Sequence, residues 1–410
     1  MYYVGIDVSK AKSDYCIIDS NKTMIKSLSS LNNMSGLKKI LKELYSVSKS
    51  TTTFFLALEA TGNFWQPVYY FFKDHGFNIV LLNPYSVKHF SQMRMSKTKT
   101  DKMDSYQIAC CIESGYAKKS IIPDDQVLSL RDIVRTKYYL HQQIYSIKRK
   151  IMTTLYSTFV EYETVFPNLF SITSLTILKK YPSAHCLAKS NSNDLIKIFR
   201  SIKGNNNSQN KANNIIKMAK DTVTPIDGIS GKEISLLSLI TLYESMNKQY
   251  KELENQIELF LNEYEVTVSK SHEQESLNPI QAVLTTPGVG IKTIAVLIAS
   301  CGDLSVFKTS TALIGYIGLY PQQYQSGKTN KSFSHKKSIP LVKKQLYCAS
   351  VACLRHNPEL RQIYLNSISK GFSKKQAKCK ISYKLAKIIW HLYNYRCKYN
   401  ANFVFTNKVS

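Results

Sequence analysis

The apolar positions in the first third of the chain follow the short runs that are typical of a sheet. The segment YYVGIDVSKAKSDYCIID, residues 2–19, predicts a strand, a polar turn and a second strand, which together form a hairpin. Residues 52–62 and 77–84 predict two further apolar strands, and residues 63–76 between them have helical spacing. The order strand, helix, strand indicates an α/β domain with a partly parallel sheet, which we assign to residues 1–122.

Beyond this domain the apolar residues recur every three or four positions, which indicates long amphipathic helices. The positions are Ile133, Leu140, Ile144, Ile147, Ile151 and Leu155 in a first helix and Met246, Tyr250, Leu253, Ile257, Phe260 and Tyr264 in a second. Residues 204–214 between them are polar and low in complexity, which favours a loop. We therefore predict a helical coiled coil over residues 123–270, with a flexible polar loop near 204–231. The two helices could pair within one chain or between protomers.

The last part of the chain, residues 271–400, is predicted to be a mainly α-helical domain, followed by a frayed tail at 401–410. Its first segment, LTTPGVGIKTIAVLIASCGD (284–303), places Pro-Gly-Val-Gly between two apolar stretches. Gly288 and Gly290 allow a tight turn and expose amide N–H groups beside a helix start, where a phosphate can bind. This pattern indicates a helix-hairpin-helix-like element, although an ordinary glycine-rich helix connection has the same composition.

The charge of the chain indicates a polyanionic partner. There are 55 Lys and Arg residues against 28 Asp and Glu, a net charge of +27, and such a surplus repels itself unless a polyanion meets it. Nucleic acid is the leading interpretation, and a generally basic soluble protein or an anionic membrane surface are the alternatives. No run of about 18 apolar residues and no signal-peptide pattern is present, so neither a membrane span nor secretion is expected. The nine scattered cysteines contain no CxxC pair, which indicates reduced thiols in a cytoplasmic protein that works at the nucleoid.

Four acidic residues stand at positions that could bring them together. Asp7 is central in the first strand, Glu59 ends a later strand, and Asp101 and Asp104 lie three apart at a helix start. Functional groups of open α/β sheets gather at the carboxyl ends of the strands. Four close carboxylates would repel one another unless a cation sits among them, and Mg²⁺ prefers such oxygen ligands. We predict a site for two Mg²⁺ ions, with Mn²⁺ as an alternative.

Simpler interpretations of these acidic residues remain open. Asp104 could be a helix cap, and a GID strand also opens the sugar-kinase and actin-like fold. Basic residues surround the predicted acidic site and continue along the first long helix, and we expect them to contact a nucleic-acid backbone. They are Lys97, Lys99, Lys102, Arg131 and Arg135.

The motifs YVGIDVSKAKSD, ALEATGNF, LNPYSVKHF and KTKTDKMDS resemble, in order, the N-terminal domain of the DEDD transposases of bacterial insertion sequences. That family is related to the Piv DNA invertases. The resemblance covers about the first 115 residues and implies an RNase-H/RuvC-like α/β fold, with Asp7, Glu59, Asp101 and Asp104 as the metal-binding tetrad. The segment LRDIVRTKYYLHQQIYSIKRKI is similar to the helix that follows that domain in the family.

The C-terminal part is similar to the same transposases from Pro287 to about Leu392, in PGVG, FKTSTALIGYIGLYPQQYQSG and NPELRQIYLNSISKG. Taken alone, a serine in a polar loop bracketed by Pro321 and Gly327 is an ordinary loop residue. The resemblance implies that Ser326 is the nucleophile that attaches to a DNA strand end, with Lys328 beside it as a contact to nucleic acid.

The resemblance implies a Mg²⁺-dependent DNA transposase or site-specific recombinase that cleaves and rejoins strands. It also implies DNA partners (element ends and target), a guiding bridge RNA, and a dimer or tetramer, and it leaves open whether the tetrad and Ser326 meet within one chain or across protomers. The alternatives are a RuvC-like junction-resolving nuclease without a covalent intermediate and a nucleic-acid packaging or scaffold protein. A sugar-kinase-like ATPase is disfavoured because a second glycine-rich phosphate loop with its acidic partner is missing after Asp7.

Overall fold

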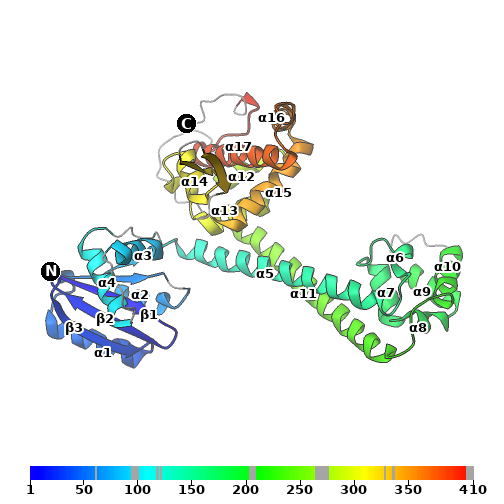
Figure 1. Ribbon diagram of the computed structural model, residues 1–410, viewed down its shortest axis with the longest axis horizontal. Coiled ribbons are helices and arrows are strands. Elements are labelled where there is room, and N and C mark those ends of the chain that lie inside the picture. The colour runs from blue at the N-terminus through cyan, green and yellow to red at the C-terminus, as the bar shows by residue number, and fades with distance from the viewer. Residues whose placement is uncertain are drawn as a thin grey trace. The chain divides into compact units, whose positions relative to one another are not determined.

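The computed structural model describes residues 1–60, 62–93, 101–116, 120, 122–202, 209–263, 277–326, 329–334 and 338–402, with only the backbone of Asp101 and of residues 321–326 and 329–334. The chain forms two compact units, Met1–Ile122 and Pro123–Ser410. The first is a mixed α/β unit and the second is mostly helical (Figure 1). None of the helices in the described ranges is both long and apolar enough to span a bilayer.

A five-stranded mixed sheet forms the centre of the first unit. Its strand order is β3-β2-β1-β4-β5. The strands β1, β2 and β3 pair antiparallel, whereas β1, β4 and β5 run parallel. The predicted hairpin and the two later strands are therefore confirmed. The bounds of the strands are Tyr2–Val8, Lys12–Ile18, Met24–Leu31, Phe54–Glu59 and Asn78–Leu82.

Sequence analysis did not predict β3 or the helix α1 (Met34–Val47). The residues of β3 are exposed or half-buried in alternation, as befits an edge strand, so they lack a strong apolar signal. The signal for α1 is present in the sequence, because Asn33 caps it through Gly36 N–H and Leu37, Ile40 and Leu44 are buried at helical spacing.

Helices cover both faces of the sheet. The side chains of Val4, Ile6 and Val8 in β1 belong to a core shared with α1 and α2 (Trp65–Asp74). The opposite face packs against α3 (Pro84–Met93) and α4 (Asp101–Glu113). The odd-numbered residues of β1 face this second layer because strand side chains alternate. A short 3₁₀ turn, Thr51–Thr53, precedes β4.

Gly5 lets α4 approach the sheet unusually closely. A Cβ atom at Gly5 would lie 2.0 Å from the carbonyl oxygen of Ser105 and 2.4 Å from the amide nitrogen of Ala109. Both atoms are backbone, so a side chain here could be accommodated only if the helix moved away. Gly5 therefore determines how α4 sits on β1.

Replacing Gly5 with valine is expected to destabilise the first unit by at least about 3 kcal/mol, because the helix backbone must shift. The expected fall in its melting temperature is roughly 10 °C or more. The chain has two tryptophans, Trp65 in the first unit and Trp390 in the second. Fluorescence of Trp65 in a Trp390→Phe background therefore reports the first unit.

A glycine without such a contact provides the control for this substitution. Gly231, an exposed residue near the start of α11 (Ile229–Glu263), has nothing within 4 Å of its ideal Cβ position. Gly231→Ala is expected to leave the first unit unchanged and to stabilise its own helix by about 0.5–1 kcal/mol. A Gly5→Val protein that melts like the parent would contradict the packing of α4 on β1.

Two long helices dominate the second unit, α5 (Asp125–Tyr156) and α11, and they lie side by side (Figure 1). Val134 of α5 shares one core with Ile257 of α11, and Ile151 shares another with Leu236. The helices are therefore antiparallel within one chain. Between the two cores the pair is joined by polar contacts, among them an ion pair of 3.0 Å between Lys137 Nζ and Glu254 Oε1. Interlocked coiled-coil packing stays a prediction.

Five short helices close the end of the pair where α5 ends and α11 begins, and their apolar side chains form one core with those ends. The predicted polar loop near 204–231 is wrong for much of its length, because residues 209–220 form α10. The many asparagines of this segment concealed Ala212, Ile215, Ile216 and Ala219, which are buried on one helical face. The helices are α6 (Tyr162–Val165), α7 (Ile172–Lys180), α8 (Ala184–Ala188), α9 (Ser192–Ser201) and α10 (Gln209–Lys220).

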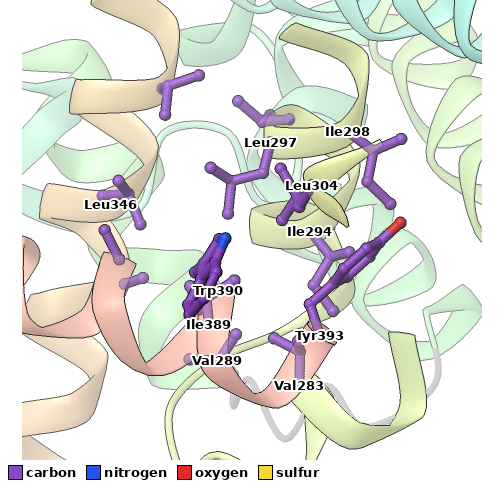
Figure 2. Close-up of a cluster of buried hydrophobic side chains, with 14 of the residues drawn as sticks. Val283, Val289, Ile294, Leu297, Ile298, Leu304, Leu346, Ile389, Trp390 and Tyr393 are labelled. Carbon is purple, nitrogen blue, oxygen red and sulfur yellow. The ribbon is translucent and has the colours of Figure 1, made fainter. Parts of the chain in front are cut away.

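The C-terminal helices form the other core of this unit, which includes the start of α5 and the end of α11. Trp390 and Tyr393 lie at its centre (Figure 2). The indole Nε1 of Trp390 donates to the carbonyl of Phe307 at 2.9 Å, and the Tyr393 hydroxyl donates to Asp303 Oδ1 at 3.0 Å. Residues 264–276 and residues 403–410 of the predicted tail lie outside the described residues. The helices are α12 (Pro279–Leu284), α13 (Ile291–Cys301), the 3₁₀ turn Leu304–Val306, α14 (Ser310–Ile317), α15 (Pro340–His356), α16 (Pro358–Ser369) and α17 (Lys374–Tyr395).

Candidate active site

Asp7 and Glu59 are neighbours at the carboxyl ends of two parallel strands. The paired residues of β1 and β4 end at Ile6 and Leu58, so Asp7 and Glu59 come next on adjacent strands. Residues opposite one another in paired strands share a face of the sheet. Asp7 therefore lies on the face of Gly5, the face that α4 covers.

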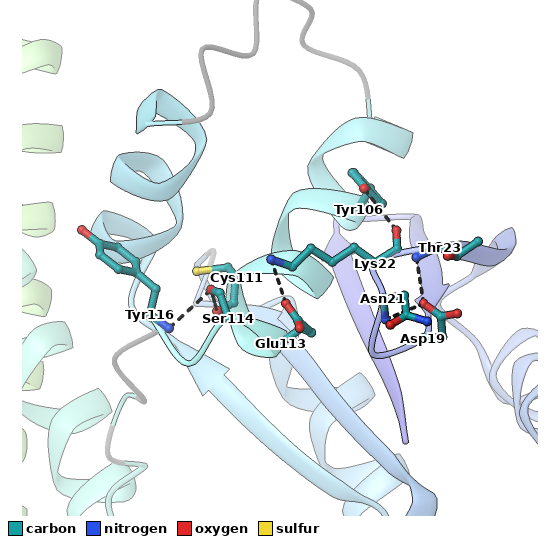
Figure 3. Close-up of polar contacts among 9 residues, drawn as sticks. All are labelled: Asp19, Asn21, Lys22, Thr23, Tyr106, Cys111, Glu113, Ser114 and Tyr116. Atoms are coloured by element: carbon teal, nitrogen blue, oxygen red, sulfur yellow. Dashed lines mark hydrogen bonds and ion pairs between the residues drawn. The ribbon is translucent and has the colours of Figure 1, made fainter.

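Contacts at the C-terminal end of α4 show which way this helix runs. Glu113 forms an ion pair of 3.2 Å with Lys22, and the Tyr106 hydroxyl lies 3.4 Å from the Lys22 carbonyl (Figure 3). Lys22 belongs to the turn after β2, beside the start of β1, because Ile18 pairs with Tyr3. The helix α4 is thus antiparallel to β1, and its first turn points toward the end of the strand that carries Asp7.

The spacing of strand and helix brings the first turn of α4 near Asp7. Gly5 lies against Ser105 and Ala109, and two further strand residues advance about 7 Å. Going back from Ser105 to Asp101 covers one helical turn of about 5.4 Å. The turn from Asp101 to Asp104 therefore lies over this edge of the sheet. Asp104 is half-buried and Asp101 is the first residue of the helix.

The donor set suits a hard cation, but a complete metal centre stays a prediction. Among the side chains that the structure describes, no group of three or more His, Cys, Asp or Glu residues is arranged to hold a metal ion. The described pair, Asp7 and Glu59, offers carboxylate oxygens on one face of the sheet, which are ligands of the kind that Mg²⁺ prefers. Further ligands would have to come from the first turn of α4, where the side chain of Asp101 lies outside the described atoms.

A third acidic residue lies beside this pair, and sequence analysis did not identify it. Asp14 of β2 is the direct antiparallel partner of Asp7 and is buried. Its carboxylate forms an ion pair of 3.3 Å with Lys12. The seven-residue separation across a short hairpin turn is a signal that could have found it, because the hairpin was predicted correctly. Three acidic residues therefore lie in a row across β2, β1 and β4.

The predicted loop around Ser326 is instead part of a β-hairpin. Strands β6 (Pro321–Ser326) and β7 (Thr329–Ser334) pair antiparallel, and Ser326 is opposite Thr329 at the turn. The prediction of a loop was wrong because these strands carry few apolar residues, so alternation left little trace in hydropathy. Lys328, together with Lys97 and Lys99, lies outside the described residues, and Lys102 is exposed on α4.

The two glycines of the predicted helix-hairpin-helix element have different surroundings. Gly288 has φ +89°, and a Cβ there would lie 2.7 Å from Cys353 Cα, so this glycine serves the close packing of α15. Gly290 is exposed, caps α13 and has open space around it. Packing thus explains why residue 288 is a glycine, and its contact with a phosphate stays a prediction. Gly290, in contrast, is accessible to a ligand.

The two arginines predicted to contact nucleic acid also differ. Arg131 Nε donates to the carbonyl of Ala299 at 2.7 Å, which ties α5 to α13. Burial lowers the pKa of Arg131, and neighbouring Arg135 adds to this effect. Arg131 therefore has a structural role, while Arg135 is exposed and its contact with nucleic acid stays a prediction.

Two family models of transposases match this chain. A transposase family model matches residues 4–160, and the transposase model of the IS116/IS110/IS902 family matches residues 280–365. The two matched segments together span more than half of the chain. The chain belongs to the IS110 family of transposases. Family membership makes it a DNA transposase in the broad sense that includes DNA invertases.

Individual relatives are similar to this chain over different lengths. A protein of insertion element IS110 from Streptomyces coelicolor is 22% identical over 78% of this chain and 76% of its own length. The pilin gene-inverting protein of Moraxella bovis is 22% identical over 94% of both chains. The transposase of insertion element IS1111A from Coxiella burnetii is 30% identical over 37% of this chain and 43% of its own length.

Proposed function

We propose that this IS110-family transposase cleaves and rejoins DNA strands at a metal-dependent acidic site, through a covalent intermediate on Ser326. The acidic site consists of Asp7, Glu59, Asp101 and Asp104. The observation that carries the proposal is the adjacency of Asp7 and Glu59 at the carboxyl ends of β1 and β4, beneath the first turn of α4.

The topology of the first unit supports an RNase-H-like fold for this site. The sheet order β3-β2-β1-β4-β5, with an antiparallel meander followed by parallel strands, places the central strand β1 between β2 and β4. A carboxylate on that strand has acidic neighbours on both sides, Asp14 and Glu59. The fold can thus present several carboxylates to one phosphodiester without a long loop.

The tetrad would hold two divalent cations, Mg²⁺ or Mn²⁺, through its carboxylate oxygens. When bound, such ions neutralise a phosphodiester and favour both the attacking and the leaving oxygen. Without bound cations, the carboxylates would repel the phosphates of the DNA backbone, which would keep DNA out of an unmetallated site. Exposed Lys102 lies on α4, the helix that carries Asp101 and Asp104, where it can attract the DNA backbone that flanks the site.

The covalent step is a transesterification. The Ser326 hydroxyl oxygen attacks the phosphorus, a new oxygen–phosphorus bond forms and one strand oxygen leaves as a hydroxyl. The proton lost by the serine is balanced by the proton that the leaving oxygen gains. Because one phosphoester bond replaces another, rejoining needs no external energy source, which suits a recombinase. The serine hydroxyl is a weak nucleophile and requires activation.

We also propose a bridge RNA as guide and a dimer or tetramer in which the tetrad of one protomer serves Ser326 of another. The net charge of +27 supports a polyanionic partner beyond the cleaved DNA.

The decisive assay uses the full chain, labelled DNA that carries the ends of its element, and RNA transcribed from the flanks. A denaturing gel is expected to show labelled DNA attached to protein with Mg²⁺, none with EDTA, and recovery on adding Mn²⁺. Adducts that persist in excess EDTA would contradict the metal requirement. Cleaved DNA without any protein-linked form would favour hydrolysis instead.

A further inference from the structure

A cationic cavity lies within the second unit. It has a volume of about 220 Å³ and forms where α5, α11, α13 and α15 meet. Its polar walls combine lysines with aromatic rings: Lys137, Lys292, Lys344, Tyr138, His141 and Tyr250. No residue of the acidic tetrad or of the serine hairpin is among the described residues that line this cavity.

The lysines of the cavity exceed the negative charge beside them. Glu254 Oε1 forms ion pairs with Lys137 Nζ at 3.0 Å and with Lys292 Nζ at 2.5 Å. Lys344 has no carboxylate within ion-pair distance in the described part of the chain. Two of the three ammonium groups therefore share one carboxylate, and the third has no such partner among the described residues. The side chain of Lys137 is only 12% exposed, and burial lowers its pKa. Glu254 balances this buried lysine, whereas Lys292 and Lys344 are exposed at the rim of the cavity, where an anion from solvent can reach them.

The rings line the cavity next to these charges. The ammonium of Lys137 lies 5.1 Å from the centre of the Tyr250 ring, and that of Lys344 lies 5.0 Å from the Tyr138 ring. The His141 ring is 6.0 Å from Tyr250. Burial lowers the pKa of His141, and the surrounding lysines lower it further. A neutral imidazole and two phenol rings are suited to stack on a base.

We propose that this cavity binds one single-stranded nucleotide unit, with its phosphate on the lysines and its base against the tyrosine and histidine rings. Small-molecule sites commonly measure about 300–1,000 Å³, so this cavity of about 220 Å³ can enclose only part of a nucleotide unit and excludes a duplex. Its rim, at exposed His141, Lys292 and Lys344, is open to the remainder of the strand. Lys292 lies in the first turn of α13, two residues after exposed Gly290, which adds the favourable field of a helix N-terminus. The inference rests on nucleic acid as the partner of this family, and it is independent of the metal site and of Ser326.

The test measures binding of labelled DNA and RNA single strands of about 10 nucleotides to the full chain, in EDTA, by fluorescence anisotropy. Lys344→Gln and Lys292→Gln are each expected to weaken binding roughly threefold to tenfold, and to reduce the slope of log affinity against log salt by about 0.7. Tyr250→Leu is expected to weaken binding of the normal strand by roughly fivefold or more, but not that of an abasic strand.

Matched variants separate the cavity from general surface charge. Lys251→Gln removes an exposed lysine of α11 that does not line the cavity, and it should bind within twofold of the parent. Tyr250→Phe keeps the ring and should bind like the parent, while thermal melts of both Tyr250 variants monitor the fold. Comparing the DNA and RNA arms identifies which strand supplies the nucleotide.

Photocrosslinking locates the base directly. Strands that carry 5-iodouracil are expected to crosslink to peptides containing Tyr138, His141 or Tyr250. The proposal is overturned if crosslinks map to other helices and both lysine variants retain the affinity and salt slope of the parent. Because EDTA is present throughout, failure of the acidic site or of Ser326 in strand cleavage does not affect this result.

Discussion

Replacing Ser326 with alanine is expected to eliminate the protein-linked DNA product completely, while binding to DNA and RNA stays unchanged. The substitution removes the only oxygen through which this residue could form a phosphoester. The residue is the last of β6, opposite Thr329, and alanine is compatible with a strand end. The measurement is the denaturing gel with labelled element-end DNA, combined with anisotropy to verify binding.

Ser332→Ala in β7 is the matched control, because Ser332 belongs to the same hairpin, paired with Gln323. It should form the covalent product at the rate of the parent. The Ser326→Ala result also separates the two enzymatic interpretations. A junction-resolving nuclease that uses water as its nucleophile would keep full strand cleavage in Ser326→Ala, and that outcome would exclude the serine intermediate.

Replacing Asp7 with asparagine is expected to lower strand cleavage by about a thousandfold. The substitution keeps the shape of the side chain but removes the charge of the residue that lies between Asp14 and Glu59. Metal ions contribute several kcal/mol to phosphodiester cleavage, and a loss of about 4 kcal/mol corresponds to a thousandfold change in rate. The rate is measured as covalent product formed per minute over a range of Mg²⁺ concentrations.

Glu43→Gln provides a control of equal charge change in the same unit. Glu43 lies on α1, which packs on the opposite face of the sheet, and forms an ion pair with Lys26. Its cleavage rate should remain within about twofold of the parent, because an exposed ion pair contributes little. A nucleic-acid packaging protein would process no DNA in either form. An Asp7→Asn protein that cleaves at the rate of the parent would refute the metal site.

Local patterns predicted much of the fold, because periodicity depends on neighbouring residues alone. The spacing of Ile144, Ile151 and Leu155 indicated α5, and the two apolar runs on either side of a polar turn in residues 2–19 indicated the hairpin. Local composition misled in two places. Asparagines concealed the buried face of α10, and polar residues concealed the pairing of β6 with β7. Tertiary packing in α10 and strand pairing in β6 and β7 outweighed the preference of the local sequence for a loop.

The candidate site was predictable in part. Asp7, Glu59, Asp101 and Asp104 came from their positions in the predicted elements and from a family resemblance, neither of which requires knowledge of distances. The position of Asp14 beside Asp7 was missed because the pairing of β1 with β2 had not been combined with the acidic residues. Arg131 could not be recognised as structural, since its partner Ala299 is far away in sequence.

The order of residues along the chain sufficed for the family, the charge, most helices and strands, and the choice of the acidic residues as candidates. Three-dimensional packing alone established that Glu59 lies next to Asp7, that Gly5 admits α4 against the sheet, and that lysines from α5, α13 and α15 surround one cavity. The reason is physical. A hydrophobic period reports which side of an element is buried, whereas register and close approach depend on atoms that the chain brings together from distant positions.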